Sequence, residues 1–469
     1  MNSTISGLQK RECFYLVIVS GLYITYNLYL ITYYPVYIDE ASTYNDFTSK
    51  GFCTSITQYP APNNHVLFSI ISNIFNYLPL EPLVKLRLPN LLIGLASSVI
   101  MYLLLKKKFN HKVAVLPHLL FSFSYTVTFY SVFARGYMLI IFFTLVCYWS
   151  IERFQEKEYN KKYLWIYSLS TILGFYTIPI FLFVSASFVL YLLYLFYSQK
   201  NILKQLVAYH FFIAIITIML YSPIIYYNGL DAIINNEFTR KLNFKEVFVY
   251  VLNHGCDIYD KLIGIRSRYF IIAFMLTLLV LYKISSDYKI RSMLIFSMLF
   301  FALPLFFMLF QKVIPGIRTW SYLIIPLALG IAVVLSYLLS KKNVSISVIY
   351  AIGTLVIITQ VYIFKKSHPF AALQNDYDSS ILSQAILKNK YKQIYFESDS
   401  SSFEFVNFNY FILSQNKNVK LSCLPQTKLI EQTLNNYDCI VLYTDDMKGL
   451  MKNKFHIVHQ KGDVIVYGK

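Results

Sequence analysis

Long apolar runs separated by polar segments dominate the chain up to residue 364. The runs cover residues 13–36, 84–105, 113–131, 134–151, 162–178, 180–198, 204–226, 269–283, 291–310, 319–340 and 344–364. A helix that crosses the hydrocarbon core of a bilayer needs about 20 predominantly apolar residues. The pattern therefore predicts a polytopic α-helical membrane protein with about eleven transmembrane helices. The first run follows Lys10 and Arg11 and lacks a small-residue cleavage site, so it is interpreted as a retained helix.

The stretch at residues 65–78 is also apolar, but it is too short to cross a bilayer comfortably. Its polar side is formed by Ser69, Ser72, Asn73 and Asn76. We therefore expect an amphipathic helix that lies at the membrane interface. This helix would form part of a long outer loop at residues 37–83.

The segment at residues 365–469 has a different pattern. Short apolar strands are predicted at 393–396, 419–423, 439–443 and 464–467, and helices at 378–389, 405–414 and 426–435. Lys461-Gly462 is typical of a hairpin turn between the last two strands. The alternation predicts a small α/β domain, interpreted as a folded cap over a transmembrane domain at residues 1–364. No nucleotide-binding glycine pattern occurs in it.

Composition and charge agree with the membrane prediction. Hydrophobic residues make up 57% of the chain and charged residues 14%, with a mean hydropathy of +0.50. A soluble protein would carry about 25% charged residues. The net charge of +18 comes from Lys and Arg between the apolar runs, as in Lys106-Lys107-Lys108, which is typical of cytoplasmic loops. A nucleic-acid binder would gather basic residues on one soluble face, so no nucleic-acid partner is expected.

The distribution of Lys and Arg also predicts the orientation. Counting residues 65–78 as a span would reverse every later segment and place Lys106 to Lys108 outside. We therefore predict a cytoplasmic N-terminus and an extracytoplasmic C-terminal domain. The heavy use of Ile, Lys, Asn and Tyr is typical of an AT-rich bacterial genome, which favours a bacterial inner (plasma) membrane.

The six cysteines show no metal-binding spacing. A disulfide among the four that fall in outer segments and a set of unpaired thiols both remain open at this stage. The interiors of the predicted spans contain no Asp, Glu, Lys or Arg, and His118 and His210 are their only histidines. This absence argues against a proton- or sodium-coupled transporter, because ionisable groups mark the pathway in such proteins.

Polar residues instead gather at the predicted outer ends of the helices. Asp39-Glu40 follow the first span, and a loop rich in Pro and Asn leads to Asn64-His65 before the interfacial helix. Arg135 falls in the run Ala134-Arg135-Gly136-Tyr137, and Arg318 begins a span after Pro315-Gly316. Each arginine alone could simply reach lipid head groups, and Asn64 and His65 could simply cap the interfacial helix.

Together these motifs resemble the GT-C superfamily, and more narrowly the protein O-mannosyltransferases and the lipid A aminoarabinose transferase. The resemblance is marked over residues 35–140, and elsewhere it covers layout only. The family often has Pro where Gly136 stands and a His-Pro-Pro-type run where Asn64-His65-Val66 stands.

The resemblance implies a glycosyltransferase whose donor is a polyprenyl-phosphate-linked sugar. Asp39 would act as the general base on an acceptor hydroxyl, with inversion at the anomeric carbon. Glu40 would orient the acceptor or bind a divalent cation, or would simply be solvated. Arg135 and Arg318 would bind the phosphate, with Lys85 and Arg87 as weaker candidates. Asn64 and His65 would contact sugar or acceptor hydroxyls.

The resemblance implies no certain cofactor, and a divalent cation stays open. The partners it implies are the lipid-linked donor, a hydroxyl-bearing acceptor (glycan, lipid or protein) and membrane lipids. Two other classes remain as alternatives: a polytopic transporter or lipid flippase, which predicts broken helices and polar residues deep in the spans, and a non-catalytic membrane scaffold.

Overall fold

The computed structural model describes residues 9–60, 64–234, 242–264, 268–342, 344–367, 383–384, 386–397, 403–415, 419–424, 436–442, 455–461 and 464–469. Contacts within the chain divide it into two compact units. Unit 1 comprises Met1–Leu30, Ile56–Phe68 and Arg87–Pro369, and unit 2 comprises Ile31–Ser55, Ser69–Leu86 and Phe370–Lys469. The predicted domain boundary at residue 364 stays a prediction.

Unit 1 is built from the apolar helices that the sequence predicts. Its long elements are α2 (Lys10–Tyr33), α6 (Pro82–Lys108), α7 (His111–Phe123), α8 (Tyr125–Val132), α9 (Tyr137–Glu156), α10 (Lys161–Thr177), α11 (Phe181–Phe196), α12 (Lys200–Asn228), α16 (Arg268–Ile284), α17 (Tyr288–Gln311), η3 (Ile317–Leu323), α18 (Ile324–Lys341) and α19 (Ile346–Lys366). Shorter helices are α13 (Asp231–Ile234), α14 (Phe244–His254) and α15 (Asp257–Ile263).

Every predicted span coincides with one of these helices or with a consecutive pair of them. Among the described residues, seven helices are long and apolar enough to cross a membrane, or eight if the bent pair α7–α8 is one span. The shorter α10, α11 and α16 hold 17, 16 and 17 residues. The prediction of an integral membrane protein with a helical membrane domain is therefore confirmed.

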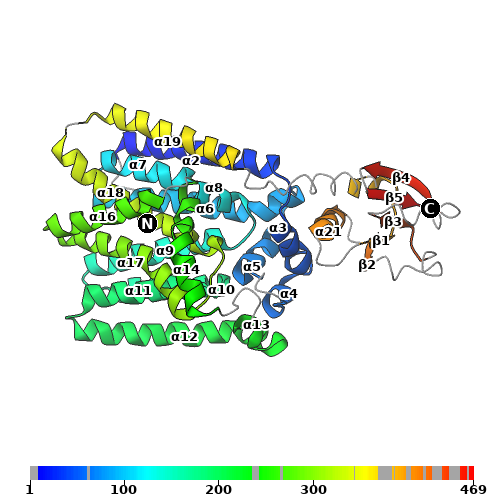
Figure 1. Ribbon diagram of the computed structural model, residues 1–469, viewed down its shortest axis with the longest axis horizontal. Helices are drawn as coiled ribbons and strands as arrows, with labels where there is room; N and C mark the ends of the chain where they lie inside the picture. The colour runs from blue at the N-terminus through cyan, green and yellow to red at the C-terminus, as the bar shows by residue number, and fades with distance from the viewer. Residues whose placement is uncertain are drawn as a thin grey trace. The chain divides into compact units, whose positions relative to one another are not determined.

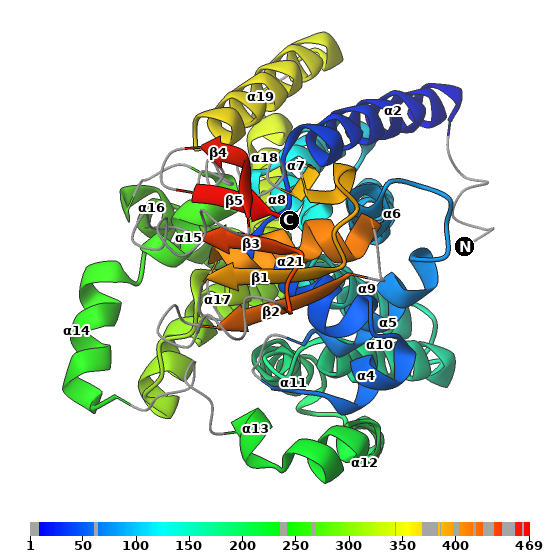
Figure 2. The same ribbon diagram turned by 90° about the vertical axis from the view of Figure 1, so that its right-hand side faces the viewer.

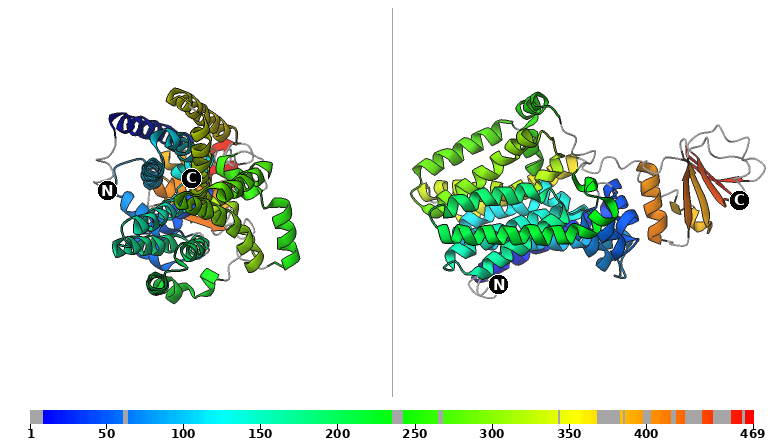
Figure 3. Two further views of the ribbon diagram at one scale, coloured as in Figure 1. Left: turned by 90° about the vertical axis from the view of Figure 1, so that its left-hand side faces the viewer. Right: turned by 90° about the horizontal axis from the view of Figure 1, so that it is seen from below.

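The helices of unit 1 pack side by side along most of their length (Figures 1 and 3). α7 packs against both α18 and α19, and α17 packs against α11, α16 and α18. α10 packs against α9 and α12. Small residues permit the close approaches: a Cβ on Gly94 of α6 would lie 2.1 Å from the Tyr23 hydroxyl of α2.

One predicted span, at residues 113–131, is a bent pair of helices rather than one straight helix. α7 and α8 meet at 47°. Ser124 between them has extended backbone, and its hydroxyl accepts the Val127 N–H at 3.2 Å as the N-cap of α8. The Tyr125 N–H donates to Gln360 Oε1 of α19 at 3.1 Å. The break is thus stabilised by side-chain hydrogen bonds in place of the backbone ladder.

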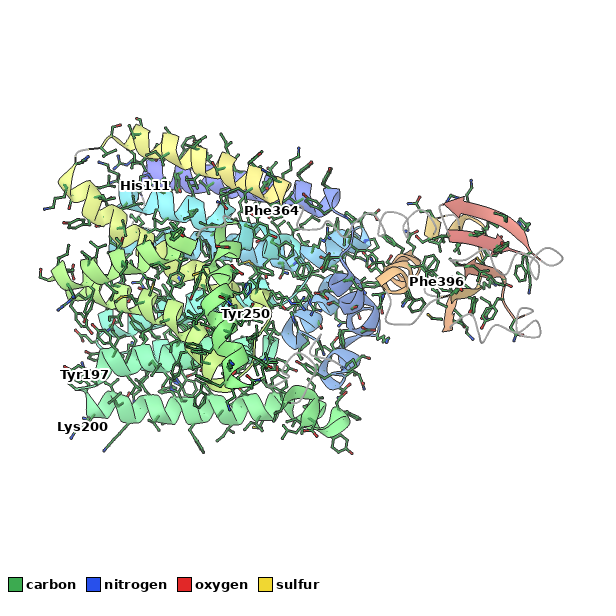
Figure 4. The ribbon with its side chains drawn as sticks, viewed as in Figure 1. His111, Tyr197, Lys200, Tyr250, Phe364 and Phe396 are labelled. Carbon is green, nitrogen blue, oxygen red and sulfur yellow. The ribbon has the colours of Figure 1, made fainter. Side chains whose placement is uncertain are left out.

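The end of unit 1 that carries His111, Tyr197 and Lys200 holds a polar network (Figure 4). Lys106 Nζ lies 3.2 Å from Glu12 Oε2, and Lys107 and Lys108 pair with glutamates of α9. The two histidines of the span interiors are hydrogen-bonded, His118 to Tyr15 and Ser98, and His210 to Tyr167 and the Leu206 carbonyl. These contacts account for both histidines structurally.

Unit 2 contains the segment after α2 and the C-terminal sheet. Its helices are α3 (Ile38–Thr43), the π-helix η1 (Tyr44–Thr48) and α21 (Phe403–Gln415), with most of α4 (Phe52–Thr57) and part of α5 (Val66–Phe75). Its strands are β1 (Gln393–Glu397), β2 (Lys420–Leu424), β3 (Cys439–Leu442), β4 (His456–Lys461) and β5 (Val464–Gly468). The sheet order is β2-β1-β3-β5-β4 (Figure 2).

The sheet confirms the predicted α/β fold of the tail. β1 pairs in parallel with β2 and β3, whereas β5 pairs antiparallel with β3 and β4. β4 is absent from the predicted strands because His456–Lys461 is mostly polar and lies at the sheet edge. The predicted helix at 426–435, half of the one at 378–389 and the glycine of the Lys461-Gly462 turn lie outside the described residues.

α5 is the helix predicted at residues 65–78. Ser69, Ser72 and Asn73 on its polar side are buried, and Asn73 Nδ2 donates to Ser55 Oγ at 2.8 Å. Ile74 is exposed instead. The polar side of α5 therefore faces protein, while its position at a membrane interface stays a prediction.

Candidate active site

His65 is the centre of the polar cluster in unit 1. Its ring is buried, and its Nδ1 accepts the backbone N–H of Gly136 at 2.7 Å. Because an amide N–H can only donate, Nδ1 carries no proton, and the neutral imidazole holds its proton on Nε2. Arg135 Nη2 lies 3.3 Å from that Nε2. Two donors therefore stand side by side, in an arrangement that suits a shared anionic acceptor.

The turn between α8 and α9 presents Arg135. The backbone N–H of Arg135 donates to the Phe133 carbonyl at 2.7 Å. The side-chain Nδ2 of Asn90 in α6 donates to the carbonyls of Phe133 and Arg135 at 2.5 and 2.8 Å. Arg135 and Asn90 are both buried. A short turn held by a buried amide fixes the direction of the guanidinium before any ligand arrives.

Electrostatic effects place Arg318 in the same cluster. The pKa of His65 is held well below its usual value, first by burial and then by the positive charges of Arg135 and Arg318. The pKa of the neighbouring Tyr59 is raised by burial, against the opposing effect of Arg135. The positive charges of Arg135 and Arg318 thus both act on His65 in unit 1.

Elements distant in sequence hold this site together. Arg318 lies in the first turn of η3, whose Trp320 is buried against Phe183 of α11, with ring centroids 5.0 Å apart. The Tyr59 N–H donates to Asn228 Oδ1 at 3.0 Å, which ties the loop before His65 to the end of α12. Tyr137 packs edge-on against the His65 ring at 4.9 Å.

The acidic pair lies in unit 2, on α3. Asp39 is half-buried. Glu40 is buried, and its Oε2 accepts the Tyr37 N–H at 2.9 Å, which stabilises the first turn of α3. Simple solvation of Glu40, one of the readings left open by the sequence, is therefore wrong. The catalytic role of Asp39 and the ligand-binding roles of Glu40 stay predictions.

The remaining candidates have structural contacts of their own. Asn64 Nδ2 donates to the Gln58 carbonyl at 2.9 Å. Lys85 Nζ of unit 2 donates to the Asn76 carbonyl at 3.2 Å, and Arg87 of unit 1 is fully buried. The ring nitrogens of His65 face Gly136 and Arg135, so the imidazole does not cap α5.

Metal and disulfide chemistry find no support in the described part of the chain. No group of three or more His, Cys, Asp or Glu residues there could hold a metal ion. All six cysteines are free thiols.

Two residues of the site were not predicted from the sequence. Asn90 supports the Arg135 turn, and the local signal for it is the Pro89-Asn90 pair inside the largely apolar run at residues 84–105. Gly136 belonged to a motif, but its role as the donor to His65 depends on a contact across 71 residues. Where relatives carry Pro at this position, the N–H that fixes the His65 tautomer would be missing.

Gly136→Ala should damage the site by steric conflict. A Cβ there would lie 2.5 Å from Thr177 Cγ2 and 3.0 Å from His65 Nδ1, so a neighbour must move. We expect a loss of about 1–3 kcal/mol in the free energy of unfolding, measured by thermal denaturation in detergent. Gly316→Ala is the matched control, because its Cβ would meet nothing closer than Arg318 Cγ at 3.8 Å. Equal stability of the two variants would contradict the described packing of Gly136.

Comparisons with known proteins agree with this architecture. A family model described as dolichyl-phosphate-mannose-protein mannosyltransferase matches residues 64–227, a range that includes His65 and Arg135. No curated protein sequence matches the chain significantly. The structure resembles that of ArnT from Cupriavidus metallidurans bound to undecaprenyl phosphate, with a TM-score of 0.60 at 12% identity over 97% of each chain. It resembles the apo state of the same protein with a TM-score of 0.62, at the same identity and coverage.

The resemblance to the GT-C superfamily that the sequence predicts is therefore confirmed: the chain has the ArnT fold over nearly its whole length, and residues 64–227 match the dolichyl-phosphate-mannose-protein mannosyltransferase family.

Proposed function

We propose that the protein is a membrane glycosyltransferase that moves a sugar from a polyprenyl-phosphate donor to an acceptor hydroxyl on the extracytoplasmic side of a bacterial inner membrane. The observation that carries the proposal is the buried pair of His65 and Arg135 together with the partly exposed Arg318, whose charge acts on His65. Support also comes from the ArnT fold, since that relative was solved with undecaprenyl phosphate bound.

The cluster suits the phosphate of a lipid carrier. A guanidinium fork matches two phosphate oxygens, and a neutral imidazole adds a directed N–H without a further desolvated charge. In this assignment Arg135 Nη2 and His65 Nε2 donate to one phosphate oxygen, and Arg318 balances the rest of the charge. As the bond to the sugar breaks, negative charge grows on the bridging oxygen, and fixed donors stabilise it.

The reaction is a single displacement at the anomeric carbon. Asp39 accepts the proton of the acceptor hydroxyl while the acceptor oxygen forms a bond to that carbon. The bond between the anomeric carbon and the phosphate oxygen breaks, and its electron pair leaves with the lipid phosphate. The products are the glycosylated acceptor, with inverted configuration, and a polyprenyl phosphate. Glu40 maintains α3 through its contact with the Tyr37 N–H.

A direct test offers the purified protein in nanodiscs a panel of polyprenyl-phosphate sugars with glycan, lipid and peptide acceptors. We expect labelled sugar to appear on one acceptor class only when protein, donor and acceptor are all present. Movement of the intact donor between leaflets without sugar transfer would instead indicate a flippase and contradict the proposal.

The neutral state of His65 predicts how donor binding depends on pH. Because its pKa lies well below the usual value, His65 stays uncharged on both sides of pH 6.5. The donor is a phosphodiester with no ionisation in this range, so its dissociation constant should stay flat between about pH 6 and pH 8. Isothermal titration calorimetry on Asp39→Asn, which should bind donor without turnover, measures it. Affinity that weakens steadily as the pH rises through 6.5 would mean that a charged imidazole binds the phosphate.

A further inference from the structure

α21 of the C-terminal segment is buried on two opposite sides. Phe408 and Ile412, one helical turn apart, lie in the core formed with the sheet, and the Phe408 ring is 4.8 Å from that of Phe396. Phe396 is labelled in Figure 4. On the other side, Val406 and Tyr410 are also one turn apart and face the segment that follows the acidic pair. α21 therefore links the C-terminal sheet to the segment that follows Asp39-Glu40.

The contacts on the second side are specific. Asn45 Nδ2 donates to the Val406 carbonyl at 2.9 Å, across 361 residues of sequence. The Tyr44 and Tyr410 rings meet edge to face with centroids 5.2 Å apart, and both are buried. Burial also raises the pKa of Tyr44. The partners in these two contacts, Tyr44 and Asn45, are the first two residues of η1, and α21 also packs against α3 itself.

η1 continues directly from the helix that carries Asp39. Its π-helical character follows from the Ser49 N–H donating to the Tyr44 carbonyl at 2.8 Å, five residues back. The wider turn changes the angle between successive side chains, which lets neighbours such as Tyr44 and Asn45 both contact α21. Within the acidic helix, the Thr43 hydroxyl donates to the Asp39 carbonyl at 2.8 Å. Asp39 thus lies one helical turn from a segment fixed by the C-terminal domain.

We propose that α21 is a positioning element of the active site, which holds the helix of Asp39 in its catalytic orientation through Asn45 and Tyr410. This inference rests on the proposed function, in which Asp39 is the base. It gives the C-terminal domain a part in catalysis rather than the passive role of a cap. Asn45, Tyr44 and Tyr410 are positioning residues and touch no substrate in this assignment.

The test compares two variants with two matched controls. Asn45→Asp keeps the side-chain shape but replaces the donor by a carboxylate that faces the Val406 carbonyl, and it leaves α21 unchanged. Tyr410→Ala removes the ring contact. Tyr410→Phe retains the ring, and Gln415→Ala changes the exposed end of the same helix.

Amide hydrogen exchange and steady-state kinetics are measured on all four proteins in nanodiscs. We expect faster exchange at residues 38–48 in Asn45→Asp and Tyr410→Ala, with exchange in β1 and β3 unchanged in Asn45→Asp. The kcat of both should fall by about tenfold to a hundredfold, because a small misplacement of a base is costly. Their Kd for undecaprenyl phosphate should stay within about twofold of wild type, as should every property of the controls.

Unchanged exchange at residues 38–48 in both variants would overturn the proposal, whatever the activity. So would faster exchange with an unchanged kcat. Wild-type protein that transfers no sugar would contradict the proposed function instead, and the exchange data alone would then decide whether α21 holds the acidic helix.

Discussion

Asp39→Asn should abolish sugar transfer while leaving the lipid carrier bound. The amide retains the shape of the side chain but cannot accept the acceptor's proton, so kcat should fall by about 10²–10⁴-fold or more. The Kd for undecaprenyl phosphate should change little, because the phosphate is assigned to residues of unit 1. Single-turnover transfer and equilibrium lipid binding, measured on the same preparation, separate the two effects.

Asp46→Asn is the control for this substitution. Asp46 lies in η1, is partly exposed, and its Oδ1 lies 3.9 Å from Lys50 Nζ. A partly exposed pair of this kind contributes about 1 kcal/mol or less, so its loss should leave transfer intact. Full activity in Asp39→Asn would remove Asp39 from the mechanism, and equal loss in both variants would indicate a general effect of removing negative charge.

Replacement of Arg135 should have the second-largest effect. Arg135→Ala removes a guanidinium held by the Asn90-supported turn and leaves His65 Nε2 as the nearest donor. A preorganised donor to developing negative charge is worth about 10²–10³-fold in kcat, and we expect a loss of that size together with weaker lipid-phosphate binding. Arg135→Lys should recover only part of it, because an ammonium cannot form the forked contact.

Arg291→Lys provides the matched control for the arginine variants. Arg291 lies over the Tyr282 ring at 4.8 Å in the first turn of α17, remote in sequence from the site residues. Kinetics of the three variants should therefore separate the Arg135 site from a general effect of arginine loss. A kcat for Arg135→Ala within about twofold of wild type would exclude Arg135 from phosphate stabilisation.

The helical framework was predictable because it depends on local composition. Uninterrupted apolar runs can bury their backbone polar groups in lipid only as helices, so the spans follow from the sequence. The break at Ser124 was not predicted, since it depends on the bond from the Tyr125 N–H to Gln360, 235 residues further along the chain. β4 was missed for the same kind of reason, because an edge strand with polar side chains owes its pairing to β5.

The sequence predicted which residues belong to the candidate site, but only part of how they are arranged. Resemblance to a family selected His65, Arg135 and Arg318, and the structure brings these three together. The family resemblance could not specify that Gly136 fixes the His65 tautomer or that Asn90 holds the Arg135 turn. Both contacts join segments that are far apart in sequence. The burial of Glu40 likewise depends on tertiary packing.

The most direct test of the account follows the phosphorus atom of the donor. ³¹P NMR of wild-type protein in nanodiscs should show the donor phosphodiester converted to a phosphomonoester only after the acceptor is added. The same conversion should be absent in Asp39→Asn. A phosphodiester signal that persists with every acceptor, while the lipid-linked sugar changes leaflet, would contradict glycosyl transfer and establish transport of the intact donor.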